Sequence, residues 1–177
     1  MRCVTKTCAI AGFGSPSRPH AAAACGLLGA PRPATAQVLV THRIPAPLAM
    51  EAVAAVVEAC AKRGYNETAV LVDADGVRQA VLRGDRAGAH TLDSAFYKAY
   101  TSASFKSDTT ALVERAKTAP IAPLLAKLPN LVLAGGGVAI KMQDEVVGAI
   151  GAAGAPGGDL DDACAKAGLT KIRDRLR

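Results

Sequence analysis

Four side chains that can bind a metal or make hydrogen bonds recur at helical spacing near the middle of the 177-residue chain. They are His90, Ser94, Tyr97 and Thr101, separated by four, three and four residues, so a helix would carry them on one side. An imidazole is a common iron ligand, and a tyrosine oxygen can also serve. We therefore take His90 as the first candidate iron ligand and Tyr97 as the second. For any one of these residues, a solvent-facing side of a helix is the more usual explanation.

Two cations and a run of glycines are candidates for the same site. Arg83 ends a predicted strand before this helix, and Lys98 follows Tyr97 on the helix itself. Either cation could hold a carboxylate group of a ligand by a charge-assisted hydrogen bond. The triplet Gly135, Gly136 and Gly137 follows a predicted strand. Such a triplet indicates either a backbone that approaches a ligand or a strand end where only glycine fits.

Other catalytic patterns are not found in the sequence. The segment Gly154–Gly158 lacks the Lys-Ser/Thr pair of a phosphate-binding loop and favours a tight backbone crossing before a helix. Asp73 and Asp75 flank a predicted turn, and turn chemistry explains them. No Ser/His/Asp triad is indicated, so catalytic residues stay unknown.

The cysteines leave two interpretations open. Three of the five lie within the first 36 residues, whereas Cys60 and Cys164 each fall on the apolar side of a predicted helix. An oxidising compartment would permit a disulfide between these two. Two buried thiols that act as small hydrophobic side chains are the favoured interpretation. There is no C-x-x-C motif and no Cys/His cluster, which argues against a zinc site.

The first 36 residues differ in composition from the rest. They carry four basic residues and no acidic one, and the apolar run Ala21–Ala30 precedes Ala34-Thr35-Ala36, which matches a signal peptidase site. We therefore predict residues 1–36 as a signal peptide, with a disordered leader as the alternative, and residues 37–177 as a single domain. The predicted location is periplasmic or secreted, or cytoplasmic if the leader is not a signal.

The overall charge of the chain is misleading. It is +6, but removing the four basic residues of the leader leaves 17 basic and 15 acidic residues, a net charge of +2. This near balance, with only 3% aromatic residues, argues against nucleic-acid binding. No other segment has the run of about 18 apolar residues that a membrane span needs.

Two periodicities alternate along residues 37–177. Helices are predicted where apolar residues recur at helical spacing, and strands where short β-prone runs are bounded by turn residues. The predicted helices cover 45–63, 90–105, 108–117 and 159–176, with a helical turn at 124–127. The predicted strands cover 68–72, 77–83, 131–134, 138–142 and 145–152.

Tight turns at 73–76 and 143–144 join two pairs of these strands. Because parallel strands need long crossover connections, strands joined by such turns must be antiparallel. We therefore predict an α/β (α+β) fold in which helices sandwich an antiparallel sheet of about five strands.

Several segments together resemble the GlcG/HbpS-like family, also known as DUF336 or the haem-degrading domain family. The same domain occurs at the C-terminus of PduO-type corrinoid adenosyltransferases. The resemblance runs from Ala49 to Arg173, and its order and spacing are specific. It is carried by ACAKRGY (59–65), VDADG (72–76), LRGD (82–85), TLDSA (91–95), KAYT (98–101), GGG (135–137), GAIG (148–151) and GAPGGD (154–159).

The resemblance implies a profilin-like sandwich, homo-oligomers, secreted members, haem binding in some members and an attributed haem degradation. The leading hypothesis is an exported, oligomeric haem-binding protein with His90 or Tyr97 near the iron and Arg83 or Lys98 at the propionates. The second is an enzyme or accessory protein that holds a small organic acid through Arg83, Lys98 and the amides of Gly135–Gly137. The third is a structural or regulatory oligomer without a ligand.

Overall fold

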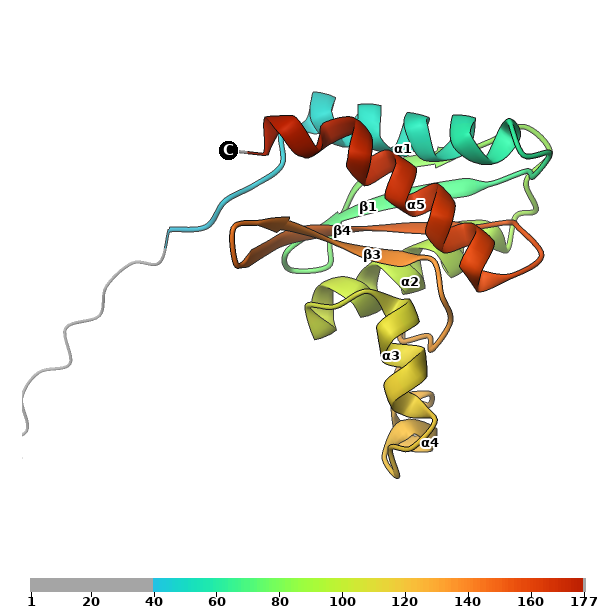
Figure 1. Cartoon of the computed structure of the whole chain (residues 1–177), viewed down its shortest axis with the longest axis vertical. Coiled ribbons are helices and arrows are strands. Elements are labelled where there is room, and N and C mark those ends of the chain that lie inside the picture. Colours follow the sequence, from blue (N-terminus) through green and yellow to red (C-terminus); the bar gives the residue numbers. More distant parts are fainter. Residues whose placement is uncertain (1–39, 177) are drawn as a thin grey trace, which may run out of the picture. The chain divides into compact units, whose positions relative to one another are not determined.

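The computed structural model describes residues 40–176, so the predicted leader at 1–36 lies outside the described residues. In the described part, helices lie on both faces of one antiparallel sheet (Figure 1). Each helix within residues 40–176 is too short or too polar to cross a lipid bilayer. The elements are α1 (Ala46–Ala61), β1 (Thr68–Asp73), β2 (Arg78–Arg83), α2 (Thr91–Phe105), α3 (Thr109–Ala116), α4 (Ala122–Leu125), β3 (Gly137–Met142), β4 (Glu145–Ala153), α5 (Gly158–Ile172) and the 3-10 helix η1 (Arg173–Arg175).

The sheet has the strand order β2-β1-β4-β3, and all neighbouring strands are antiparallel. The two hairpins meet at the central pair β1–β4, where Thr68 lies opposite Ala153. This confirms the predicted fold class with four strands, since residues 131–134 form no strand. In that segment the Val132 amide donates a hydrogen bond to Thr101 Oγ1 (3.0 Å) on α2, which ties it to a helix and not to the sheet.

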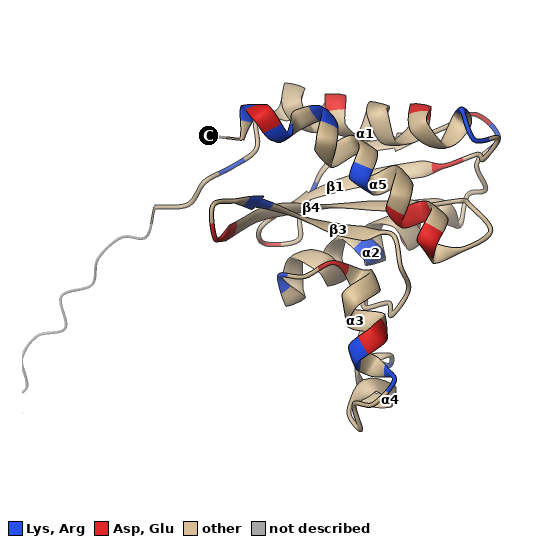
Figure 2. Ribbon diagram, viewed as in Figure 1, with Lys and Arg blue, Asp and Glu red and all other residues tan. Residues whose placement is uncertain are grey.

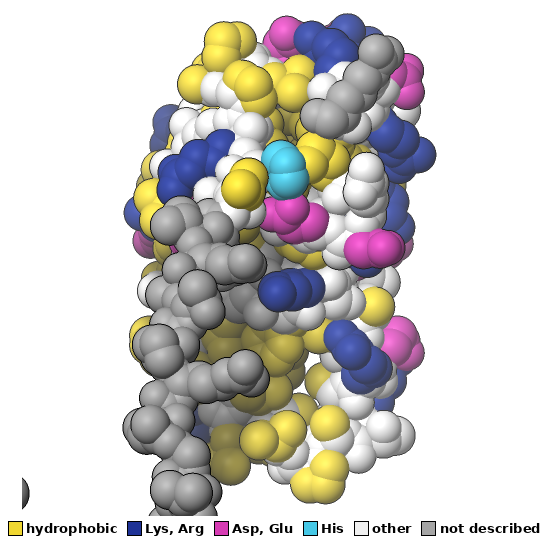
Figure 3. All heavy atoms as spheres, turned by 90° about the vertical axis from the view of Figure 1, so that its left-hand side faces the viewer, with side chains coloured by type: hydrophobic (Ala, Val, Ile, Leu, Met, Phe, Trp, Pro, Cys, Tyr) yellow, Lys and Arg dark blue, Asp and Glu magenta, His cyan; other side chains and the backbone are white. Residues whose placement is uncertain are grey.

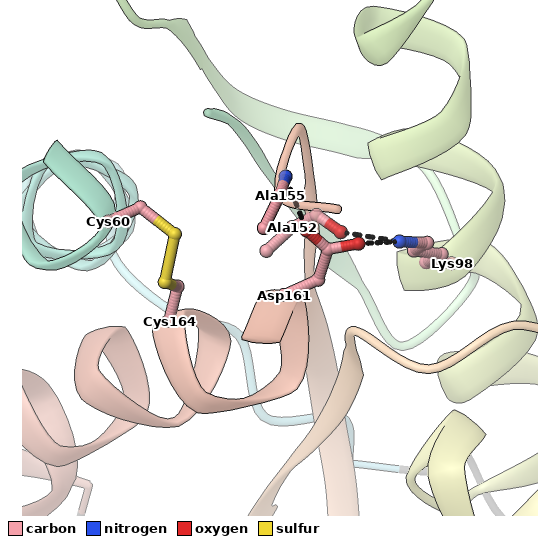
Figure 4. Close-up of a disulfide and its surroundings, with 6 residues drawn as sticks. All are labelled: Cys60, Lys98, Ala152, Ala155, Asp161 and Cys164. Atoms are coloured by element: carbon pink, nitrogen blue, oxygen red, sulfur yellow. Dashed lines mark hydrogen bonds and ion pairs between the residues drawn. A yellow bond between two sulfur atoms is a disulfide. The ribbon is translucent and has the colours of Figure 1, made fainter. Parts of the chain in front are cut away.

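Helices α1 and α5 cover one face of the sheet. Large apolar side chains from the central strands, such as Leu71 and Ile150, pack there beneath Val53 of α1. A disulfide joins Cys60 of α1 to Cys164 of α5, with a sequence separation of 104 (Figure 4). The favoured interpretation of two free thiols is therefore wrong, because the antiparallel-sheet fold brings the two helices into contact at these positions.

Helix α2 covers the other face, and small residues bring it close to the sheet. Ala95 and Ala99 of α2 pack on Val70 of β1 and Ala149 of β4. At Gly151 of β4, an added Cβ would lie 2.0 Å from the Ala95 carbonyl oxygen, so no other residue fits there without a shift. Helix α2 lies over β4, β1 and β3 and barely contacts β2.

The segment with α3 and α4 extends away from the sheet (Figure 1). It carries exposed hydrophobic side chains, with Leu124 exposed by 61% and Ile121 by 55%. Figure 3 shows hydrophobic side chains gathered at the end of the described part where Figure 1 places α4.

Candidate functional site

Lys98 and Asp161 form a buried ion pair between α2 and the first turn of α5. Their side chains are only 6% and 5% exposed. The Lys98 ammonium also donates to the carbonyl oxygen of Ala152 (3.0 Å), and the Ala155 amide donates to Asp161 Oδ1 (3.0 Å) (Figure 4). The Lys98 ammonium is therefore bound to partners inside the protein. The prediction that Lys98 meets a propionate or an organic acid is wrong, because the packing of α2 turns this side chain inward.

Glu67 is a buried acid beside this pair that the sequence analysis missed. The residue is 1% exposed, and its carboxyl group lies beside Asp161 and the Ala155 backbone. Burial raises the pKa of the Glu67 carboxyl to about 8, and the negative charge of Asp161 adds to the shift. The neutral, protonated form of the Glu67 carboxyl is therefore favoured by its surroundings. The sequence offered one signal for this buried acid, namely an acidic residue directly before the predicted apolar strand 68–72.

Gly135–Gly137 pass behind the buried pair instead of forming an open cradle. At Gly136, whose φ is 112°, an added Cβ would lie 3.1 Å from the Lys98 ammonium. The Gly137 amide already donates to Thr109 Oγ1 (2.8 Å). The backbone of the triplet therefore serves close packing, and Lys98 and the Gly137 amide already have partners within the protein.

The segment Gly154–Gly158 is the predicted tight crossing. Gly154 has a φ of 148°, and an added Cβ would lie 2.2 Å from the Asn66 carbonyl oxygen. Helix α5 begins at Gly158 with Gly157 as its N-cap, one residue before the start of the helix predicted over 159–176. The crossing is what brings Asp161 to the sheet edge beside Lys98.

His90 and Tyr97 lie on the accessible side of α2. His90 directly precedes the helix, is exposed, and packs its ring against Gly88, where an added Cβ would be 2.6 Å from His90 Cε1. No hydrogen bond or ion pair engages its imidazole within residues 40–176. Tyr97 is half-buried, with its ring centroid 5.7 Å from that of Phe96. His90 and Tyr97 are seven residues apart, which is about two helical turns, so both lie on the same side of α2.

The other two members of the predicted polar face differ in burial. Thr101 is fully buried, and its hydroxyl is used by the backbone of the segment before β3. Ser94 is half-buried, as Tyr97 is. The accessible part of the predicted face therefore comprises His90, Ser94 and Tyr97.

Arg83 faces the same side of the sheet as α2. It lies opposite Thr68 in the β1–β2 pair, and the Thr68 hydroxyl is 2.6 Å from that of Thr91 at the start of α2. Directly opposed residues in an antiparallel pair share a face. Arg83 is exposed, and no ion pair engages it in the described part of the chain. Val81, two residues earlier on the same face, is 40% exposed because α2 does not cover β2.

Hollows in the surface lie elsewhere. One of about 690 Å³ lies between β3, the start of α3 and α5, and two smaller ones flank Phe105. His90, Tyr97 and Arg83 line none of these. The side of α2 that carries His90 is therefore an open surface.

Protein metal ligands do not cluster in residues 40–176, where no group of three or more His, Cys, Asp or Glu could hold a metal ion. His42 is exposed, and its Nδ1 lies 2.7 Å from Glu145 Oε2. A single accessible imidazole such as His90 is suited to bind a metal ion that a prosthetic group already holds.

Comparison with known proteins identifies the family. A family model described as "Haem degrading protein HbpS-like" matches residues 44–170. The chain belongs to the HbpS-like family. A search of the curated proteins found no match for this HbpS-like chain.

Solved structures agree with this assignment. The crystal structure of HbpS is 34% identical, covers 76% of this HbpS-like chain and 93% of its own, and superposes with a TM-score of 0.71. A double mutant of Streptomyces reticuli HbpS is 35% identical over 80% of this chain and 97% of its own, also with a TM-score of 0.71. The structure titled "PduOC:Heme Complex" shares the fold, with a TM-score of 0.68, 22% identity, and coverage of 74% of this chain and 96% of its own.

The functional groups of this HbpS-like chain fall into two sets. Glu67, Lys98 and Asp161 are sealed from solvent where α2, β4 and α5 meet. His90, Tyr97 and Arg83 are reachable from outside. Only the second set can meet a ligand without a rearrangement of the fold.

Proposed function

We propose that this HbpS-like protein binds haem and that His90 supplies an axial ligand to the iron. Membership of a family described as haem-degrading is the observation that carries the proposal. The structure adds an exposed imidazole with no competing hydrogen bond in the described part. When bound, haem would bring redox-active iron chemistry to this surface.

Other exposed residues on the α2 side of the sheet are available to the rest of a haem group. Leu92 is 37% exposed and Val81 is 40% exposed, which offers apolar contact to a porphyrin ring. Arg83, on the same side of the sheet, can pair with a propionate. Tyr97 is the second candidate ligand. The related fold of PduOC was solved as a complex with heme, so the architecture is compatible with this group.

Titration with hemin tests both parts of the proposal. We expect a Soret band that saturates at a fixed ratio of hemin to protein. The variant His90→Ala should lower the affinity by roughly ten-fold or more, about 1.4 kcal/mol. His42→Ala is the matched control, because it removes the other histidine of residues 40–176.

The outcomes separate haem binding from the ligand assignment. An unchanged band and affinity in His90→Ala would reject His90 and direct attention to Tyr97→Phe. Absence of any saturable hemin binding would reject the proposed function and favour the third hypothesis, an oligomer without a ligand. Loss of the Soret band in the presence of a reductant and oxygen would extend the proposal to haem degradation.

Export and self-assembly are further parts of the proposal. The Cys60–Cys164 disulfide supports an oxidising compartment, as does the Ala34-Thr35-Ala36 site before Gln37. Native mass spectrometry of the protein from its own host tests both points. We expect a mass that lacks residues 1–36 and a defined homo-oligomer. A retained leader would contradict export, and a monomer would contradict assembly.

A further inference from the structure

Three cationic side chains border the hollow of about 690 Å³ between α5, β3 and the start of α3. Lys166 and Arg173 lie seven residues apart on one side of the α5–η1 segment, and Lys141 comes from β3. Figure 2 shows basic positions on both α5 and β3. The volume falls in the range of roughly 300–1,000 Å³ that is typical of small-molecule sites.

The acidic groups near this hollow are already engaged. Asp108 Oδ1 accepts a hydrogen bond from the Ala139 amide (2.9 Å), which closes part of the exposed edge of β3. Asp162 Oδ2 lies 2.6 Å from the Lys166 ammonium, and this contact raises the pKa of Lys166. By contrast, no hydrogen bond or ion pair engages Lys141 or Arg173 within residues 40–176. Because Asp108 keeps its negative charge and Asp162 offsets Lys166, the hollow carries a small net positive charge, from Lys141, Lys166 and Arg173 against Asp108 and Asp162.

Helix electrostatics explain only part of this arrangement. A cation just beyond the end of α5 interacts favourably with the helix dipole, which accounts for Arg173, and the i,i+4 pair with Asp162 accounts for Lys166. The dipole gives no reason for Lys141 to lie on the facing strand. Like charges that converge on one concave surface raise the local concentration of anions.

Much of the remaining lining is apolar, and Ser107 and Thr170 add hydroxyl groups. Leu169 and Leu176 line the hollow from the helical side, and Val138 and Ala111 from β3 and α3. A ligand that fits would therefore carry a negative charge at one end and an apolar body at the other.

We propose that this groove binds a small organic anion, with its carboxylate or phosphate held by Lys141 and Arg173 and its apolar part against Leu169 and Leu176. The site uses none of the residues assigned to haem. The proposed anion site does not depend on whether the protein binds haem.

The test is an NMR titration of the full chain with three probes, namely inorganic phosphate, 1-naphthyl phosphate and 1-naphthoate. We expect saturable shifts at residues 138–141 and 166–176, with an aromatic anion bound more tightly than inorganic phosphate. Comparison of the two aromatic probes distinguishes a phosphate from a carboxylate as the preferred group. The double variant Lys141→Gln/Arg173→Gln should weaken the binding of the aromatic anions by roughly ten-fold or more.

A matched control removes two exposed cations elsewhere, as Arg63→Gln/Lys127→Gln, and should bind the probes as the unmodified protein does. The groove variant should keep its melting temperature and its hemin titration, so a failure here is distinguishable from failure of the haem proposal. Three results would overturn the inference: no saturable binding of either aromatic anion, shifts confined to other surfaces, or equal weakening in the control. A groove variant that changes only the assembly mass would show that a second copy fills the groove, which also overturns it.

Discussion

Replacement of Glu67 by glutamine should make the protein more resistant to alkaline pH. In the folded protein, burial raises the pKa of Glu67 from its ordinary value of 4.5 to about 8. Below about pH 4.5 the residue is protonated in both folded and unfolded chains and has no effect on the pH dependence. Between these two values the folded chain holds a proton that the unfolded chain releases. Stability should therefore fall as the pH rises through this window, and level off above it.

The size of the effect follows from the shift. One pKa unit corresponds to about 1.36 kcal/mol, so a rise from 4.5 to about 8 lowers the free energy of unfolding by at most about 5 kcal/mol. Part of this is shared with Asp161, whose negative charge contributes to the shift and to which Lys98 is paired. Glu67→Gln keeps the shape of the side chain and removes its titration. Relative to the unmodified protein, the variant should gain stability progressively from about pH 5 to about pH 9.

Urea unfolding followed by far-UV circular dichroism measures this difference, since the chain has no tryptophan for fluorescence. The informative quantity is how the difference between the two proteins changes with pH, because a constant offset only reports the fit of the new amide. Glu114→Gln is the matched control, since Glu114 is exposed and its carboxylate pairs with Lys117 (2.7 Å). The control should give a stability profile parallel to that of the unmodified protein.

Parallel profiles for Glu67→Gln and the unmodified protein across the whole range would refute the reasoning. Such a result would mean that Glu67 is ionised in the folded state at neutral pH, with water or a cation beside its carboxylate. A gain of the same size in Glu114→Gln would refute it as well, because general charge repulsion would then explain the effect.

Three further predictions concern the packing. Cys60→Ala/Cys164→Ala should lower the free energy of unfolding in urea by roughly 4–5 kcal/mol, because the disulfide closes a separation of 104 residues; the same stability as the oxidised protein would contradict this. Lys98→Met should cost roughly 3–5 kcal/mol by leaving Asp161 buried without its partner, and adding Asp161→Asn should recover part of the loss; a cost under about 1 kcal/mol in the single variant would show that the pair is solvated. Gly151→Ala should lower the melting temperature by a destabilisation of roughly 1–3 kcal/mol, since the new Cβ would lie 2.0 Å from the carbonyl oxygen of an α2 residue, and calorimetry that shows no change would contradict that approach.

Much of the fold could be predicted because its signals are local. The helix predicted over 90–105 is α2 (Thr91–Phe105), and that predicted over 45–63 is α1 (Ala46–Ala61). Apolar residues at helical spacing identify such helices wherever they pack. The turn at 73–76 required an antiparallel pair, which is the β1–β2 hairpin. The segment 131–134 was misassigned because a short apolar run looks the same on a strand as in a loop held against a helix.

The candidate site was predictable only in part. Spacing alone placed His90 and Tyr97 on one side of α2. It did not reveal that Lys98, next to Tyr97, points into the protein toward Asp161, 63 residues away. A helical wheel orders residues around an axis, but the neighbouring strands decide which side is covered.

The sequence by itself determined the local elements, the antiparallel pairing within each hairpin and the family. Only the tertiary structure decided the protonation of Glu67 and the pairing of Cys60 with Cys164. Both depend on the central contact between β1 and β4, which closes the two hairpins into one sheet and sets the helices against it. A pKa responds to the solvent and charge around a group, and a disulfide to the distance between two thiols. Neither quantity exists until segments far apart in the chain have met.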